Sequence, residues 1–150
     1  MKKASTYILV IFSGLLLFGC SNSDQQQIMA DRTGSPCGEK PNCVSTLESR
    51  EDFTLAQFTL SQQGGQNWQA IIDNALELPG ASMAQQEDNY FRVECRSRIF
   101  GFVDDFEVRR QGDTLIVRSE SRTGYSDFGV NRERAEQFRQ LLIAAGLLKP

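Results

Sequence analysis

The alternation of apolar and polar residues after residue 52 predicts a strand, a helix, four more strands and a final helix. Residues 53–60, FTLAQFTL, are rich in β-branched and aromatic side chains, which is typical of a strand. Residues 68–76 carry apolar side chains at helical spacing, namely Trp68, Ile71, Ile72, Ala75 and Leu76. Asn67 is a residue type that caps helices, and Pro79 and Gly80 stop the pattern. This part of the chain is therefore predicted to form one strand and one amphipathic helix.

Three or four strands follow. Residues 90–97, 102–109 and 114–122 alternate apolar and charged positions, and residues 82–87 are the candidate for a fourth strand. In residues 90–97, Phe91, Val93 and Cys95 lie on one face, and arginine and glutamate side chains lie on the other. In residues 102–109, Asp104 falls on the apolar face and Asp105 on the charged face. The sheet is thus predicted to have an apolar face and a charged face.

Gln111 and Gly112 predict a two-residue hairpin loop between the last two strands, because glycine readily adopts the positive φ of such loops. In the resulting register apolar side chains face each other, which supports it. Its pairs include Phe106–Val117, Val108–Leu115, Asp105–Arg118 and Asp104–Ser119.

The last helix is predicted from an apolar stripe at Ala135, Phe138, Leu141, Leu142 and Ala145. Asn131 is the expected N-cap, and Gly146 can end the helix. The element order is therefore β-α-β-β-β-β-α. It predicts an α+β two-layer sandwich, in which helices cover one face of an antiparallel sheet and the charged face is open to water. This architecture resembles the TATA-binding-protein-like fold, a likeness that carries no function.

The first twenty residues have the features of a secretory signal. Lys2 and Lys3 precede the apolar run of residues 7–18, which is short for a membrane span. An uncleaved anchor is the alternative. The sequence LFGC, which ends at Cys20, resembles a bacterial lipobox, in which the cysteine is acylated and becomes the first residue of the mature chain. Ser21 follows it where an aspartate would indicate retention in the inner membrane. We therefore expect a palmitate-bearing lipoprotein of the cell envelope, anchored in the outer membrane and facing the periplasm.

Three regions follow from this interpretation. Residues 1–19 are the signal peptide, residues 20–35 the lipidated N-terminus and a flexible tether, and residues 36–150 a single globular domain. Removal of residues 1–19 leaves 14 basic and 19 acidic residues, a net charge of −5. This acidic balance argues against nucleic-acid binding, which needs a basic surface. The expected partners are the membrane, through the lipid anchor, and either an envelope protein or a small anionic ligand.

Cysteine usage agrees with an oxidising compartment. Cys37 and Cys43 lie close together in the loop PCGEKPNC and are predicted to form a disulfide, with free thiols as the alternative. A zinc site is disfavoured because the chain has no histidine and too few cysteines. Cys95 lies on the apolar face of its strand and is expected to be a buried, unreactive thiol.

The stretch VRSESRTGYSDFGVNRER, residues 117–134, concentrates arginines, hydroxyl groups and two glycines where the last strand leads into the last helix. Structural bracing is the favoured interpretation, because nearby carboxylates can pair with the arginines. The alternative is an anion-binding site that uses Arg118, Arg122 and Arg132 beside a helix N-terminus. The candidate cluster, for either role, consists of Asp104, Asp105, Arg118, Ser119, Arg122, Tyr125, Ser126, Asp127, Asn131 and Arg132.

The sequence favours a non-catalytic role. Without histidine it contains no Ser-His-Asp or Cys-His arrangement, and it has no phosphate-binding loop, dinucleotide fingerprint or cluster of metal ligands. No catalytic residue, metal or cofactor is therefore predicted. Asp104 is the one candidate for an acid of an unrecognised hydrolase, and a hydrogen-bonded structural aspartate is the favoured alternative.

Three segments together resemble the domain of unknown function 1499 family. They are PNCVST at 41–46, FVDDFEV at 102–108 and the stretch 117–134, and the resemblance covers most of residues 36–142. Thr46 stands where that family usually has serine. The resemblance implies domain limits and an envelope location, and it implies no reaction. The sequence thus predicts an envelope-anchored lipoprotein that binds a ligand or partner, with an anion-binding module or a hydrolase as alternatives.

Overall fold

The computed structural model describes residues 29–149. The predicted signal peptide, the acylated Cys20 and residues 21–28 lie outside this part of the chain, so these predictions stay untested. Within residues 29–149, no helix is long and apolar enough to cross a membrane.

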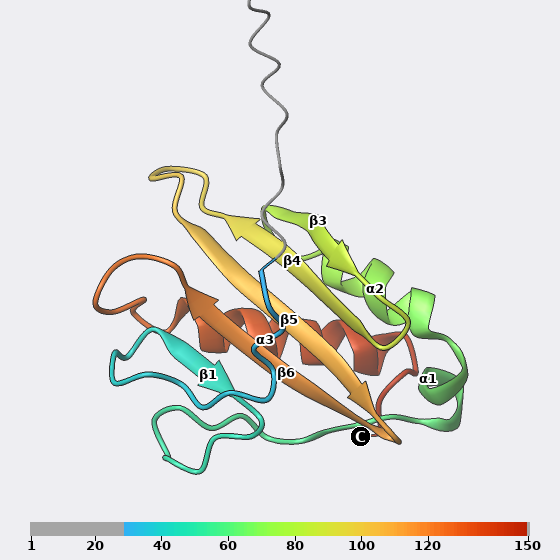
Figure 1. Ribbon diagram of the computed structural model, residues 1–150. Helices are drawn as coiled ribbons and strands as arrows, with labels where there is room; N and C mark the ends of the chain where they lie inside the picture. The colour runs from blue at the N-terminus through green and yellow to red at the C-terminus, as the bar shows by residue number, and fades with distance from the viewer. Residues whose placement is uncertain (1–28, 150) are drawn as a thin grey trace, which may run out of the picture.

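The domain is α+β and contains one antiparallel sheet (Figure 1). Its order is β1-β6-β5-β4-β3, and β2 also pairs with β6. The strands are β1 (Cys43–Ser45), β2 (Phe58–Thr59), β3 (Ala81–Gln86), β4 (Tyr90–Arg96), β5 (Val103–Gln111) and β6 (Thr114–Ser121). The four consecutive strands β3 to β6 confirm the predicted meander, with boundaries within one or two residues of those expected.

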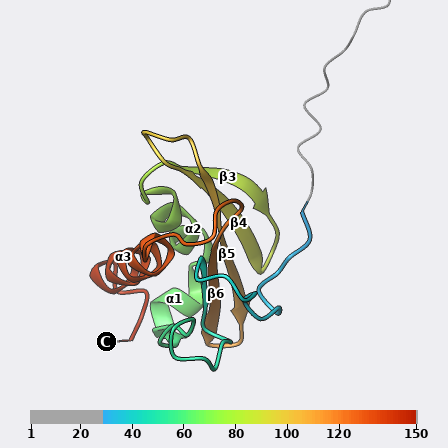
Figure 2. The same cartoon turned by 90° about the vertical axis from the view of Figure 1, so that its left-hand side faces the viewer.

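Three helices lie on one face of the sheet (Figure 2). They are α1 (Gln62–Gln66), α2 (Trp68–Leu76) and α3 (Val130–Ala144). The start of α2 is as predicted, because the Asn67 side chain accepts a hydrogen bond from the Ala70 N–H at 3.1 Å. The predicted start of α3 is wrong: the N-cap is Gly129, at φ 86°, and Asn131 lies inside the helix. Glycine suits this position because other residues rarely adopt a left-handed backbone.

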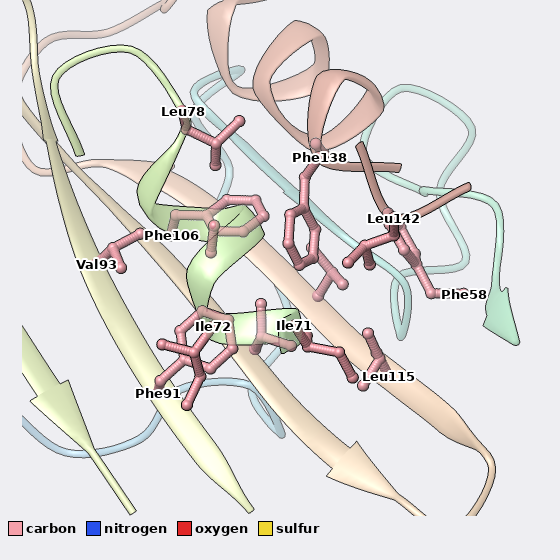
Figure 3. Packing of buried hydrophobic residues seen from close by; sticks show 14 of the residues in the cluster. Phe58, Ile71, Ile72, Leu78, Phe91, Val93, Phe106, Leu115, Phe138 and Leu142 are labelled. Carbon is pink, nitrogen blue, oxygen red and sulfur yellow. The ribbon is translucent and has the colours of Figure 1, made fainter. Parts of the chain in front are cut away.

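Apolar side chains of the sheet and helices interlock in one core (Figure 3). Phe106 of β5 and Phe138 of α3 meet edge to face at 5.1 Å between ring centroids. Phe58 packs on the other side of Phe138, at 6.0 Å. The predicted apolar stripes of α2 and α3 supply Ile71, Ile72 and Leu142, which are fully buried. These contacts join the sheet and the helices of residues 29–149 into one hydrophobic core.

The predicted register of the last hairpin is wrong by two residues. Asp105 lies opposite Glu120, and Arg118 lies opposite Glu107. The loop consists of Gly112 and Asp113, between the paired residues Gln111 and Thr114. A shift of two residues keeps every side chain on its own face, so the agreement of apolar faces could not distinguish the two registers.

The predicted strand at 53–60 is reduced to Phe58–Thr59, with isolated bridges at Thr54 and Leu60. Its buried side chains, Leu55, Phe58 and Leu60, do not keep the two-residue period of a strand. Two elements were not predicted. The short helix α1 forms in a glycine-rich segment, and the short strand β1 pairs with the end of β6.

Residues 29–36 cross the face of the sheet opposite the helices (Figure 2). Arg32 donates hydrogen bonds to Asp105, Glu107 and Glu120 on that face. Two predictions are corrected by these contacts. The described part of the segment assigned to a flexible tether belongs to the folded domain, and the charged face is covered instead of open to water.

Candidate functional site

The covered face contains a network of ion pairs centred on Asp105. This carboxylate is 1% exposed and accepts hydrogen bonds from three arginines. Arg92 of β4 binds it at 2.9 Å, Arg122 at 2.9 and 2.7 Å, and Arg32 at 3.1 Å. Alternation along the strands places Asp105, Arg92 and Arg122 on one face, and Arg32 reaches them from the segment above.

Two further carboxylates complete this network. Glu107 is fully buried and accepts hydrogen bonds from the Tyr90 hydroxyl at 2.9 Å and from Arg32. Glu120 accepts from Arg32 and from Arg118, both at 2.6 Å. Each arginine of the network therefore has a carboxylate partner, and each buried carboxylate has at least one cation. Such mutual pairing offsets the cost of removing these charges from water.

The network shifts the pKa values of its members. Burial raises the pKa of Asp105, but hydrogen bonds from Arg122 and Arg92 outweigh it and hold that pKa below its ordinary value. The hydrogen bond to Asp105 raises the pKa of Arg122. Burial, reinforced by the charge of Glu107, raises the pKa of Tyr90. Asp105 is thus ionised and Tyr90 protonated at neutral pH, which suits a structural role.

A second polar cluster lies on the helix side of the sheet. Asp104 is bound by Arg134 at 2.7 Å. Asn131 is fully buried, and its Oδ1 accepts hydrogen bonds from Ser119 and Arg134, both at 2.6 Å. Its Nδ2 donates to the Asn42 carbonyl at 2.9 Å. Asn131 thereby joins α3 to β6 and to the loop before β1, a role that replaces the predicted helix cap.

The loop between β6 and α3 places a carboxylate at the helix N-terminus. Asp127 accepts hydrogen bonds from the N–H groups of Gly129 at 3.1 Å and Asn131 at 2.8 Å. Ser126 accepts one from the Phe128 N–H at 3.2 Å. The backbone groups that a bound anion would use are therefore already engaged by Asp127.

The three arginines of the anion-binding alternative do not form one cluster. Arg118 and Arg122 lie on the covered face and pair with carboxylates. Arg132 lies on α3 and donates to the carbonyls of Thr54 at 2.8 Å and Asp52 at 3.1 Å. It borders an open hollow of about 190 Å³, which is also lined by Pro41, Cys43, Val44, Asp52, Ser126, Asp127 and Gly129.

Cys37 and Cys43 form the predicted disulfide. The Glu48 carboxylate anchors this loop by accepting from the Cys37 N–H at 3.2 Å, and its hydrogen bond with Arg50 lowers the pKa of Glu48 to about 2. Cys95 is a buried free thiol, as predicted. Burial raises its pKa to about 11, so it is protonated and unreactive at neutral pH.

The arrangement offers little for catalysis. Asp104 and Asp105 point to opposite faces and each pairs with arginine, so they cannot act together on one substrate. Residues 29–149 hold no cluster of three or more His, Cys, Asp or Glu side chains placed to bind a metal. Tyr125 is 74% exposed.

Sequence reasoning identified most of these groups and missed several of their partners. It found Asp105 and Arg122, and it did not predict the roles of Arg32, Arg92 and Glu107. The alternation along the strands placed Arg92 and Glu107 on the same face as Asp105. It could have predicted that they interact, because same-face side chains of adjacent strands lie close together. Arg32 gave no signal, because the polar segment around it has no periodicity.

The three segments that carry the family resemblance meet at one end of the sheet. Asn42, from PNCVST, donates to the carbonyls of Ser121 and Gly124, both at 3.3 Å. Arg122 joins the third segment to Asp105 of the second. The model of the family described as protein of unknown function (DUF1499) matches residues 35–142. The chain belongs to this family. No curated protein matches the chain.

At this end of the sheet, two neighbouring loops expose apolar side chains. They are residues 97–102, between β4 and β5, and residues 123–129, before α3. Their bases are close together because Asp104 pairs with Ser121, and in Figure 1 the β4–β5 hairpin projects at the top of the view while residues 123–129 curve to the left. We call these two loops, together with Val130 at the start of α3, the apolar end. Its exposed side chains are Ile99, Phe100, Phe102, Tyr125, Phe128 and Val130.

Proposed function

We propose that this DUF1499 protein is a lipid-anchored envelope module that binds a partner through the apolar end and performs no reaction. The lipid anchor would be the acylated Cys20, after cleavage of residues 1–19. Ser21 supports an outer-membrane location facing the periplasm, and the Cys37–Cys43 bridge agrees with an oxidising compartment.

The observation that carries the binding role is the exposure of the apolar end. Phe100 is 75% and Phe128 94% exposed, and they belong to the two neighbouring loops. Five of the nine large apolar side chains that are exposed within residues 29–149 lie in these loops, and a sixth, Val130, begins α3 directly after them. A gathering of apolar side chains in water is unfavourable and marks interaction surfaces in folded proteins. Scattered single side chains would need no such explanation.

The charged stretch of residues 117–134 supports the same proposal, because its arginines already have partners within the domain. Arg122 and Asp105 are engaged with each other, and Asp127 occupies the start of α3. An anionic ligand would have to displace these carboxylates, and a hydrolase that uses Asp104 would have to break its pair with Arg134. The stretch therefore fits a brace that holds the two loops of the apolar end in place.

The test is photo-crosslinking in the envelope of the host. A photoreactive phenylalanine analogue replaces Phe100 or Phe128, and replaces Leu47 as the matched control, because Leu47 is 54% exposed and lies outside the apolar end. We expect adducts from positions 100 and 128 well above those from position 47. The Cys20→Ser form, which we expect to remain uncut and unacylated, should lose them. Equal labelling from all three positions would overturn the binding role, and correct acylation of Cys20→Ser would overturn the anchor.

A further inference from the structure

We infer that the partner of the apolar end is the membrane surface itself, so that the domain docks on the bilayer to which its anchor is attached. This inference rests on the proposed function and specifies its partner.

The loops have the composition of a segment that inserts into the membrane interface. Phe100 and Phe102 stack on each other at 5.7 Å, with Ile99 beside them at the tip of the hairpin. Tyr125 and Phe128 extend from the neighbouring loop. Aromatic and aliphatic side chains are the residue types that partition into the boundary between headgroups and acyl chains.

The charge near the hairpin tip is positive although the whole chain is acidic. Residues 96–102 contain Arg96 and Arg98 and no acidic residue. Both arginines are exposed, and neither has a carboxylate within ion-pair distance among the described residues. Arg96 donates only to the Gly101 carbonyl, at 3.1 Å, within its own hairpin. The two side chains are therefore available to the phosphates of anionic lipids.

The length of the preceding chain fits this orientation. Nine peptide steps separate Cys20 from Met29, and nine extended residues span at most about 30 Å. Met29 lies against Arg92, with its sulfur 3.2 Å from Nη1. From Arg92, the strand runs four residues to Arg96 at the base of the hairpin, which is about 14 Å. A domain acylated at Cys20 would thus be held close enough for the apolar end to touch the same membrane.

A second protein is the rival occupant, and three points favour the membrane. The apolar side chains sit on two loops, the β4–β5 hairpin contains two arginines without an ion pair among the described residues, and the anchor proposed at Cys20 places a bilayer within reach. Membrane attachment by a lipid chain is strengthened by a second contact of this apolar and basic kind.

The test is cosedimentation of the chain from Ser21 onward, which lacks the anchor, with vesicles of phosphatidylethanolamine and phosphatidylglycerol. We expect the parent chain to bind. The double variant Phe100→Ser with Phe128→Ser should bind at least about tenfold more weakly, because two insertable side chains are lost. Leu47→Ser, which removes an exposed apolar side chain outside the apolar end, should bind like the parent. Thermal unfolding confirms that each variant is folded.

The charge contribution is measured in the same assay. Arg96→Gln with Arg98→Gln should weaken binding to the anionic vesicles, by about fivefold for each arginine, and should have no effect on vesicles of phosphatidylcholine alone. Arg110→Gln is the matched control, because Arg110 lies at the opposite end of β5. Failure of the parent to bind, or equal loss in the Leu47→Ser control, would overturn the inference. Protein adducts from positions 100 and 128 without vesicle binding would overturn the membrane as partner and leave the proposed binding role standing.

Discussion

Asp105 is a buried carboxylate on which three arginines converge. It accepts hydrogen bonds from Arg32, Arg92 and Arg122, which come from three separate segments. Removing one partner from a buried ion pair costs about 3–5 kcal/mol, because the other charge stays buried without compensation. Exposed pairs contribute only about 0–1 kcal/mol. Because Asp105 is buried, we expect its ion pairs to contribute more to the stability of the fold than exposed pairs do.

The pKa of Asp105 predicts how acid destabilises the domain. Its folded pKa lies below the ordinary value, so it contributes stability above the unfolded pKa, and this contribution is lost as the pH falls through the folded value. We expect Asp105→Asn to lower the free energy of unfolding at neutral pH and to flatten its decline below about pH 4.

Urea unfolding at a series of pH values measures this effect. Asp113→Asn is the control, because Asp113 is exposed in the β5–β6 loop and has no ion pair among the described residues. Asp113→Asn should keep the pH dependence of the parent. An Asp105→Asn curve that runs parallel to the parent curve through the acid range would show that the lowered pKa of Asp105 does not cause the loss of stability in acid.

At the scale of elements, the segment of residues 29–36 acts as a cover for the charged face. Arg32 places one guanidinium against three carboxylates of β5 and β6. Asp31 pairs with Arg109 of β5 and gives the segment a second attachment next to Arg32. Within the segment, Asp31 also accepts from the Thr33 N–H at 2.8 Å. Without this cover, Glu107 would keep only the Tyr90 hydroxyl as a hydrogen-bond donor among the side chains that now contact it.

This cover leads to a prediction about domain limits. The family match begins at residue 35, but a chain that starts at Pro36 lacks Arg32. We expect it to be less stable than a chain that starts at Met29, by about 3 kcal/mol or more, because Asp105, Glu107 and Glu120 each lose a cation. Denaturant unfolding of the two chains measures the difference.

Arg32→Ala in the longer chain provides the matched control for truncation. It should reproduce most of the loss, since Arg32 makes the ion pairs of the segment with these three carboxylates. Equal stability of the two chains would show that the segment contributes nothing and would restore the tether interpretation for residues 29–35.

At the scale of the whole molecule, the fold and the site differ in how far the sequence could predict them. Periodicity located α2, α3 and the strands β4 to β6, because the apolar side chains of each lie on one face of a regular element. It could not fix the hairpin register, since Asp105 stays on the same face whether it pairs with Arg118 or with Glu120. It could not find β1 or the covering segment, because their positions depend on contacts with residues far away in sequence.

The sequence predicted many of the residues of the candidate site but not how they are arranged. Sequence reasoning favoured bracing and named both Asp105 and Arg122, which the structure joins. It treated Arg118 as exposed, whereas its side chain is 4% exposed and its partner is Glu120. The sequence also did not show that the loops of Phe100 and Phe128 start from neighbouring strand ends, because this follows from the pairing of Asp104 with Ser121.

The central claim is that the arginine-rich stretch braces the fold. The most direct measurement is the free energy of unfolding of Arg122→Ala, compared with Arg98→Ala, which removes an exposed arginine without an ion pair among the described residues. Arg122 is 31% exposed and bridges Asp105 and Glu94, so we expect a loss of about 2–3 kcal/mol, between the values for exposed and buried pairs. Arg98→Ala should unfold like the parent. If Arg122→Ala also unfolds like the parent while crosslinking from the apolar end is lost, the stretch is a binding site and the bracing account is wrong.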